Sequence, residues 1–336
     1  GLALHDEGMV MAVGGGLSQL ATVQIFCHVV RSCCDLGDYR RAEEWNRAIE
    51  DYFAPTGLSS FPGDCETHRV TIMIHRGAWV FAEQEAHRAC AKVQCIDMVQ
   101  VGMAFAGIGE IRLRMGDLTG AAAAFAKAEE LDASALPGRA RLELLRGRPA
   151  DAAALINAAL ADRTWDRLDR TRLLPDQVTI ALAVGDLGTA RAAATELGES
   201  AQVYSSAALL AAAEGARGAL ALATGEDDPL RPLRSSVKLW REAESPYERA
   251  RAQVLLATAL ERAGQPEAAR MELAAARDCF DHLGARLDAE AAAAQLAAST
   301  GSEVSSSLRL NLGSAWPLMF RDQLGGLRRT PGASLR

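Results

Sequence analysis

The sequence has few aromatic residues, no long apolar run and no signal peptide. Aromatic residues make up 5% of a chain that is 49% hydrophobic, and much of the apolar content is alanine, the best helix former. Small side chains let helix backbones approach closely, which suits antiparallel helix pairs better than a thick globular core. Because no run of about 18 apolar residues occurs, we expect no membrane span and place the chain in the cytoplasm.

Apart from the segment after Ser299, which has five arginines against Glu303 and Asp322, charge of one sign is not concentrated in any part of the chain. The arginines of that segment do not share one helical face, so we do not expect it to bind DNA. The net charge of −7 is spread along its length, and no basic stripe suits a phosphate backbone. One ladder alternates acidic and basic residues, which indicates a solvated, self-neutralised helix face: Asp162, Arg163, Asp166, Arg167, Asp169 and Arg170. We therefore predict no direct binding of nucleic acid.

The cysteines do not form the pattern of a secreted disulfide framework. There are seven, an odd number, and Cys33 and Cys34 are neighbours. A reducing cytoplasm is the simpler interpretation. Buried cysteine commonly packs as a small hydrophobe, and we favour that role here. Redox sensing by Cys33, Cys34 or Cys95 remains an alternative.

Two cysteine–histidine pairs have the i,i+3 spacing that allows chelation from one helix. They are Cys65 with His68 and His87 with Cys90. No Cys-x-x-Cys motif accompanies them, and two such pairs on different helices would have to meet in space to complete a zinc site. We predict that these residues pack structurally and that the chain holds no metal or other cofactor, with metal binding as the alternative.

Motifs for catalysis are absent from the sequence. It contains no Gly-x-Ser-x-Gly elbow and no His-Glu-x-x-His motif. Leu17 and Ser18 follow Gly14-Gly15-Gly16 where a phosphate loop would have Gly-Lys-Ser/Thr. We predict that the chain is not an enzyme and binds no nucleotide. Four tryptophans are expected in the core rather than in a ligand groove: Trp45, Trp79, Trp165 and Trp240.

A glycine recurs along the chain with gaps of 40, 39, 31, 38, 40 and 39 residues. The seven positions are Gly37, Gly77, Gly116, Gly147, Gly185, Gly225 and Gly264. An alanine stands five residues after six of these glycines: Ala42, Ala82, Ala121, Ala152, Ala190 and Ala269. The exception is Gly225, where Leu230 stands at that position. Such a period is typical of stacked helix–turn–helix units.

The residues beside these glycines are those of helix ends. Aspartate follows Gly37, Gly116 and Gly185, so each glycine can end one helix and the aspartate can cap the next. The short gap before Gly147 predicts a truncated first helix within 136–146. Two prolines after Gly225 predict that the next helix begins only near Leu233.

These patterns predict an all-α fold, a solenoid of about seven degenerate tetratricopeptide-like helix pairs. We expect about 70% helix and essentially no sheet. The helical-repeat domain should cover residues 1–298. Residues 299–336 should form an irregular, mobile tail, because glycines and prolines interrupt any long helix there.

The spacing resembles tetratricopeptide repeats, in which small residues on the second helix pack against the first. Alanines also stand twelve residues after four of the glycines: Ala89, Ala128, Ala159 and Ala276. The usual period is about 34 residues, so these units are longer and degenerate.

Several segments resemble the helical-repeat region of large LuxR-type bacterial regulators, which are also fused to cyclase and ATPase modules. The resemblance covers roughly residues 5 to 297 and is carried by Cys65-Glu66-Thr67-His68-Arg69, Gly77-Ala78-Trp79, Glu85-Ala86-His87-Arg88-Ala89-Cys90, Leu136-Pro137-Gly138, Leu239-Trp240-Arg241-Glu242 and Pro246-Tyr247-Glu248-Arg249-Ala250-Arg251. This region lacks the Walker A loop and the helix-turn-helix of those regulators, so we expect it to be a segment of a longer protein.

The resemblance implies a binding module of a LuxR-type transcriptional regulator that passes binding to neighbouring domains. The partner would be a protein segment or a small-molecule effector bound in a concave groove. Whether the chain also forms a homo-oligomer is left open by the sequence. The alternative is a stand-alone adaptor that binds a partner protein and senses no small molecule.

Overall fold

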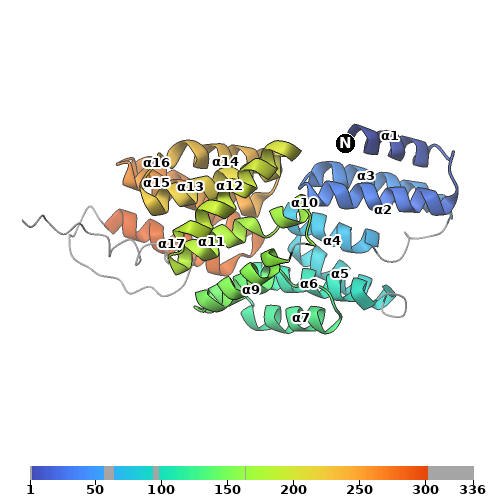
Figure 1. The fold of residues 1–336 in the computed structure, drawn as a ribbon, viewed down its shortest axis with the longest axis horizontal. Coiled ribbons are helices and arrows are strands. Elements are labelled where there is room, and N and C mark those ends of the chain that lie inside the picture. The colour runs from blue at the N-terminus through green and yellow to red at the C-terminus, as the bar shows by residue number, and fades with distance from the viewer. Residues whose placement is uncertain (1, 57–63, 94–97, 163, 302–336) are drawn as a thin grey trace, which may run out of the picture.

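The computed structural model describes residues 2–56, 64–93, 98–162 and 164–301, and every regular element in these ranges is a helix. Figure 1 shows the helices stacked as antiparallel pairs. The predicted all-α solenoid is therefore confirmed. The predicted tail lies almost entirely outside the described residues.

Each of the seven predicted glycines lies between the two helices of one pair. The pairs are α2 (Gln19–Asp35) with α3 (Tyr39–Phe53), α4 (Asp64–Arg76) with α5 (Trp79–Val93), α6 (Met98–Met115) with α7 (Leu118–Glu130), α8 (Gly138–Leu145) with α9 (Pro149–Ala161), α11 (Leu174–Val184) with α12 (Leu187–Tyr204), α13 (Ala207–Thr224) with α14 (Leu230–Glu242), and α15 (Pro246–Arg262) with α16 (Pro266–Leu283). The remaining described elements are α1 (Leu2–Val13), the 3-10 helix η1 (Ala54–Thr56), the short α10 (Arg167–Thr171) and α17 (Arg286–Gly301).

The turns have the geometry that their residues dictate. Gly116 has a φ of +84°, the left-handed region in which a side chain is strained. Asp117 then accepts a hydrogen bond from the backbone N–H of Gly120 at 2.8 Å and caps α7. Asp38 and Asp186 cap α3 and α12 in the same way. Each turn thus satisfies helix ends that would otherwise lack partners.

The alanine five residues after the glycine packs between the two helices of its pair. All six of these alanines have no exposed surface: Ala42, Ala82, Ala121, Ala152, Ala190 and Ala269. A larger side chain there would push the helices apart, because protein interiors are close-packed.

Two predictions about helix length had different outcomes. The truncated helix is confirmed, because α8 has only eight residues. The late start of the helix after Gly225 is wrong: α14 begins at Leu230, and Pro232 is buried in its first turn. Proline is tolerated there because the first four N–H groups of a helix have no partner within it.

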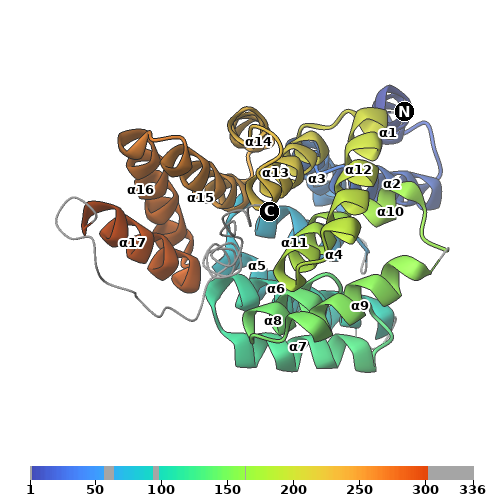
Figure 2. The ribbon, with the colours of Figure 1, turned by 60° about the vertical axis from the view of Figure 1, so that its left-hand side comes forward.

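The superhelix turns far enough for its early pairs to meet its late pairs. Helix α4 contacts α15, and α6 contacts α17. Arg76 forms an ion pair with Glu244, and Arg286 Nη2 donates to the carbonyl of Gly116 at 3.5 Å. Figure 2 shows the first helices of most pairs facing inward. The solenoid is therefore closed on itself rather than open.

Helix α13 is the one helix of the described residues long and apolar enough to cross a membrane by composition. It contains Glu214 and Arg217, and half of it is buried in the protein. It packs against α11, α12, α14 and α15. In this fold it is a core helix of the superhelix.

Candidate functional site

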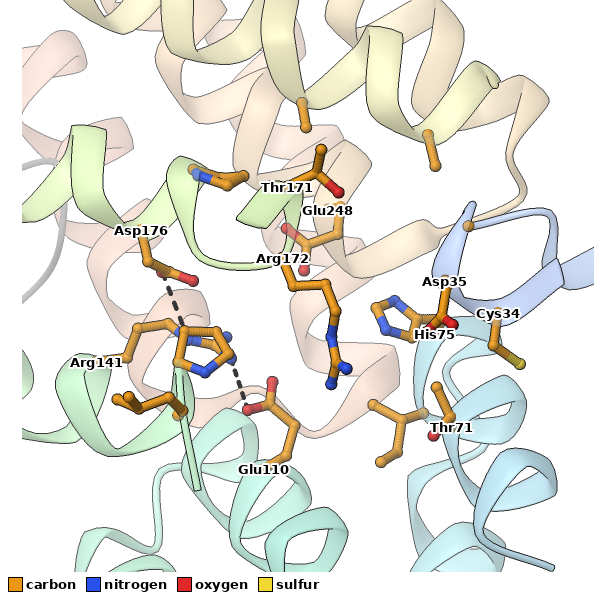
Figure 3. A pocket seen from close by; sticks show the side chains of 18 of the residues that line it. Cys34, Asp35, Thr71, His75, Glu110, Arg141, Thr171, Arg172, Asp176 and Glu248 are labelled. Carbon is orange, nitrogen blue, oxygen red and sulfur yellow. Dashed lines mark hydrogen bonds and ion pairs between the residues drawn. The ribbon is translucent and has the colours of Figure 1, made fainter. Parts of the chain in front are cut away.

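A cavity of about 570 Å³ lies on the concave side of the superhelix. Its walls come from α2, α3, α4, α6, α7, α8, α10, α11, α13, α14 and α15 and from the segments before α8 and α11. The residues six positions before the first six turn glycines all line it: Arg31, Thr71, Glu110, Arg141, Thr179 and Ala219. Residues distant in sequence therefore converge because they share one register on the first helices (Figure 3).

Glu110 is the centre of a charged network in the cavity wall. It accepts hydrogen bonds from Arg114 Nε at 2.5 Å and from Arg141 Nη2 at 2.7 Å. Burial alone would raise the pKa of Glu110, but Arg141 and Arg114 outweigh it and lower that pKa to about 2. Glu110 is thus ionised and fully engaged at neutral pH.

Glu248 connects this network to the other end of the superhelix. It lies on α15, 3.2 Å from Arg114 Nη2 and 3.0 Å from Arg251 Nη1. Burial opposes ionisation, but Arg251 and Arg114 keep the pKa of Glu248 below its usual range. The Arg114 guanidinium also stacks over the ring of Tyr247, 4.6 Å from its centroid. The cavity wall and the closure of the superhelix therefore share the same ion pairs.

Asp176 is less well compensated. Its Oδ1 lies 3.5 Å from Arg141 Nε, too far for a good hydrogen bond. Burial raises the pKa of Asp176, and the attraction of Arg141 only partly offsets it. This carboxylate can accept a further donor.

Arg172 is the one arginine of the cavity lining for which the described structure contains no ion pair or side-chain hydrogen bond. It follows α10 and is exposed, and Figure 3 shows its guanidinium extending into the space between Glu110 and His75. The nearby Asp35 is paired with Arg31, with 3.5 Å between Oδ2 and Nε. Burial raises the pKa of Asp35, and the positive charges of Arg172 and Arg31 partly offset that effect. Arg172 thus acts on Asp35 at a distance, forms no ion pair of its own in the described structure, and presents its positive charge to the cavity.

His75 forms a neutral, flat part of the wall. Its ring stacks on Tyr39 with 4.1 Å between centroids. Burial and the positive Arg114 lower the pKa of His75 to about 3, so it is uncharged at neutral pH. Its buried Nδ1 makes no hydrogen bond in the described structure.

The rest of the lining combines apolar side chains with hydroxyl groups, such as those of Thr71, Thr179 and Ser236. It can therefore bind and orient a molecule but offers little for catalysis. Val70, Ile74, Met103, Leu209 and Leu255 are among the apolar lining residues. Among the described residues of the lining, Cys34 alone carries a thiol, and burial raises its pKa well above the usual range. A thiol that stays protonated is a poor nucleophile.

The structure describes only one of the two predicted cysteine–histidine pairs in full. The side chain of Cys65 lies outside the described residues, while His68 lines the cavity. His87 is exposed near Glu83, and Cys90 Sγ lies 3.9 Å from the carbonyl of Val101. The described residues contain no cluster of three or more possible metal ligands. A structural role for these pairs remains a prediction.

The redox alternative is disfavoured at the two neighbouring cysteines. Burial raises the pKa of Cys33 to about 12, and Asp38 adds to the effect. The pKa of the buried Cys34 is raised even further by the same cause. Because the thiolate is the species that oxidants attack, neither is a reactive sensor at neutral pH. Cys95 lies outside the described residues.

One tryptophan and one arginine of the charged ladder differ from expectation. Trp79 is buried and donates to the carbonyl of Ile74 at 2.9 Å, as a core residue does, but Trp240 lines the cavity. Arg170 pairs with Glu196 on α12 rather than with the neighbouring aspartates.

Sequence reasoning missed the charged cavity residues, although a signal for them exists. The residues thirteen positions before five of the glycines also line the cavity: Met103, Ser134, Arg172, Ala212 and Arg251. Counting back from each glycine would have identified the concave face of each first helix. This counting identifies which positions lie on the concave face. It does not show which charged residues of different pairs contact one another there.

The comparisons with known proteins show the fold and no family. No protein-family model matches the sequence, and no curated protein matches it. Among solved structures, the chain is similar to one from the APC/C heterotetramer Cut9–Hcn1, with a TM-score of 0.54, 12% identity, and coverage of 91% of this chain and 55% of that chain. This chain thus spans about half of that chain's length.

Two further solved structures are less similar. One is a Rap protein complexed with competence and sporulation factor, with a TM-score of 0.49 and 13% identity over 84% of this chain and 72% of that chain. The other is the TPR2AB domain of yeast Sti1 in complex with pHSP90, with a TM-score of 0.29 and 14% identity over 89% of this chain and 100% of that chain. The chain is a tetratricopeptide-like helical repeat by fold.

Proposed function

We propose that this chain is the non-catalytic, ligand-binding sensor module of a LuxR-type transcriptional regulator. The ligand occupies the cavity on the concave side of the superhelix. Its binding is passed to neighbouring domains through the relative angle of the helix pairs. The absence of catalytic and phosphate-binding motifs and the resemblance of residues 5 to 297 support this assignment.

One observation carries the proposal: the cavity and the closure of the superhelix use the same residues. Arg114 and Glu248 line the cavity and also pair across α6 and α15 at 3.2 Å. A ligand that contacts either residue changes the free energy of the closed arrangement. Binding can then shift a population between closed and more open superhelices.

A pair of alanine substitutions tests whether the cavity binds. Ala212 lines it, whereas Ala192 is exposed on α12. The neutral apolar probe N-phenyl-1-naphthylamine should bind the purified chain saturably, and Ala212→Phe should abolish binding while Ala192→Phe leaves it unchanged. Equal binding by both variants would show that the probe sits elsewhere and that the cavity is not a binding site.

The regulator context has a separate test in the gene. It predicts that the natural reading frame encodes a Walker A loop before this segment and a helix-turn-helix after it. Sequencing both flanks decides the point. A frame without either element would remove the regulator assignment and leave the binding module.

The alternative of an adaptor for a partner protein has one observation in its favour. Helix α1 exposes Leu4, Val10 and Met11, which are 68%, 65% and 60% exposed. Exposed apolar surface of this kind is found at protein interfaces. Substituting these three residues by glutamine should abolish capture of a partner by an adaptor but leave probe binding in the cavity intact.

A further inference from the structure

We propose that the ligand of the cavity is a small amphipathic anion, an apolar body with one acidic head group, and that Arg172 holds the head group. This inference rests on the proposed function, because it assigns a ligand class to the same cavity. It follows from the charges of the lining, the unpaired state of Arg172 and the size of the space.

The charge of the lining differs in sign from that of the chain. Among the described residues, five arginines and four carboxylates line the cavity. If all are ionised they leave one positive charge, whereas the whole chain carries −7. The cavity is therefore a locally positive site in an acidic protein, and a single negative charge would neutralise it.

The ion pairs of the lining show where that surplus lies. Arg114, Arg141 and Arg251 are paired with Glu110 or Glu248 at 2.5–3.2 Å, and Arg31 is paired with Asp35 at 3.5 Å. Arg172 has no such pair in the described structure, and its guanidinium extends into the open space (Figure 3). A planar guanidinium binds a carboxylate or phosphate through two parallel hydrogen bonds. The acidic head group of a ligand would therefore meet Arg172.

The remaining walls and the volume define the rest of the ligand. Apolar side chains from α4, α6, α11, α13 and α15 face the space, among them Val70, Met103 and Leu209. A volume of about 570 Å³ lies within the range of about 300–1,000 Å³ typical of small-molecule sites.

Two probes that differ only in charge test the proposal on the intact chain. 8-Anilino-1-naphthalenesulfonate is an amphipathic monoanion, and N-phenyl-1-naphthylamine is the same ring system without the sulfonate. Fluorescence titration should show one saturable site for each probe. We expect the anion to bind the wild-type chain about tenfold more tightly or better, as a charge-assisted hydrogen bond allows.

Substituting Arg172 should remove that preference. Arg172→Gln should weaken binding of the anion about tenfold and leave binding of the neutral probe unchanged. Arg167→Gln is the matched control, because Arg167 is also exposed, lies on α10, which Arg172 follows, and does not line the cavity. Unchanged binding of the anion by the Arg172 variant, with its melting temperature intact, would overturn the assignment.

The outcomes separate this inference from the proposed function. If Ala212→Phe abolishes both probes while Arg172→Gln affects neither, the cavity binds but not through an acidic head group. If Ala212→Phe affects neither probe, the cavity is not a binding site and both proposals fail.

Competition experiments distinguish the two head groups that share this chemistry. Octanoate, octyl phosphate and octanol should be titrated against the bound sulfonate probe. Displacement by either anion but not by octanol supports the inference and identifies the preferred head group. Displacement by octanol as strongly as by the anions would overturn it. So would displacement by an acidic octapeptide alone, which would indicate a peptide ligand.

Discussion

The two helices of each pair behave differently, although the same glycine fixes the register of both. On the second helices, the position five residues after the glycine is alanine in six of seven pairs and is fully buried in all six. On the first helices, the position six residues before the first six glycines lines the cavity and is occupied by arginine, threonine, glutamate, arginine, threonine and alanine.

This difference separates packing from recognition. Every pair must bring two helix backbones together in the same way, so a small residue recurs wherever they touch. The concave face has no such common requirement, because each first helix contributes to a different part of one cavity. The regular part of the repeat therefore carries the architecture, and its irregular part carries the chemistry.

The comparison predicts that the largest loss of stability comes from a substitution on the concave face of the first helices, where the residues differ from pair to pair. Glu110→Ala removes the carboxylate that Arg114 and Arg141 share. It leaves Arg114 with Glu248 at 3.2 Å and Arg141 with only the more distant Asp176 at 3.5 Å. We expect the free energy of unfolding to fall by about 3–5 kcal/mol, measured by urea denaturation. Glu130→Ala is the control, because Glu130 is 64% exposed and pairs only with Lys127. Equal effects of the two substitutions would show that the buried network is dispensable.

Overpacking the recurring alanine position of the second helices should lower the free energy of unfolding by a smaller amount. Ala269 lies on α16, the second helix of the last pair, and has no exposed surface. Ala269→Trp should lower the free energy of unfolding by about 1–3 kcal/mol, seen as a lower melting temperature. The neighbouring Met271, which is 75% exposed, provides the control Met271→Trp. An unchanged melting temperature of the Ala269 variant would contradict the packing role.

His75, which lines the cavity on the concave face, should also make the free energy of unfolding depend on pH. Its pKa falls from 6.5 to about 3 on folding, so proton uptake favours the unfolded chain. The stabilisation is fully present above pH 6.5 and is lost as the pH falls toward 3. At pH 5.5 this residue should cost about 1.4 kcal/mol relative to pH 8.

His75→Phe measures that contribution by difference. Phenylalanine keeps a flat ring against Tyr39 but has no titrating nitrogen. Urea denaturation of both proteins from pH 8 to 5.5 should show a smaller loss for the variant, and the exposed His282 serves as a control through His282→Phe. Parallel curves for wild type and the His75 variant would contradict the neutral, buried state of His75.

The smallest effect on stability is expected at the solvent-exposed ion pair that joins the early and late helix pairs. Arg76 and Glu244 form an ion pair between α4 and the turn before α15, with side chains 28% and 44% exposed. A double-mutant cycle with alanine at both positions should give a coupling energy of about 0.2–1 kcal/mol, because solvent screens the pair. A larger value would mean that this contact, rather than the buried network, holds the superhelix closed.

Much of the fold could be predicted because it is encoded locally. Glycine and aspartate specify each turn, alanine specifies the close approach of two helices, and the spacing of glycines specified seven pairs and the short α8. The error at α14 arose because the prolines were interpreted as breakers, although Pro232 lies in the first turn of a helix, where it is tolerated.

The candidate site could not be predicted to the same extent. Glu110, Arg141 and Glu248 each resemble ordinary charged residues of an amphipathic helix, and Arg172 looks like one more basic residue of the charged ladder. Their partners lie on other helix pairs, 31 residues away for Glu110 with Arg141. No local pattern distinguishes a charge that faces solvent from one that faces another pair.

The sequence by itself determined the helix pairs, their turns and the face that each first helix presents to the concave side, because these depend on neighbours within one repeat. Only the tertiary structure decided that the superhelix closes, which arginines are neutralised and that Arg172 is not. Closure accumulates from a small rotation at every pair. Together these rotations bring α4 into contact with α15 and α6 into contact with α17. Charged residues of distant pairs, such as Arg114 and Glu248, come together only in the closed superhelix.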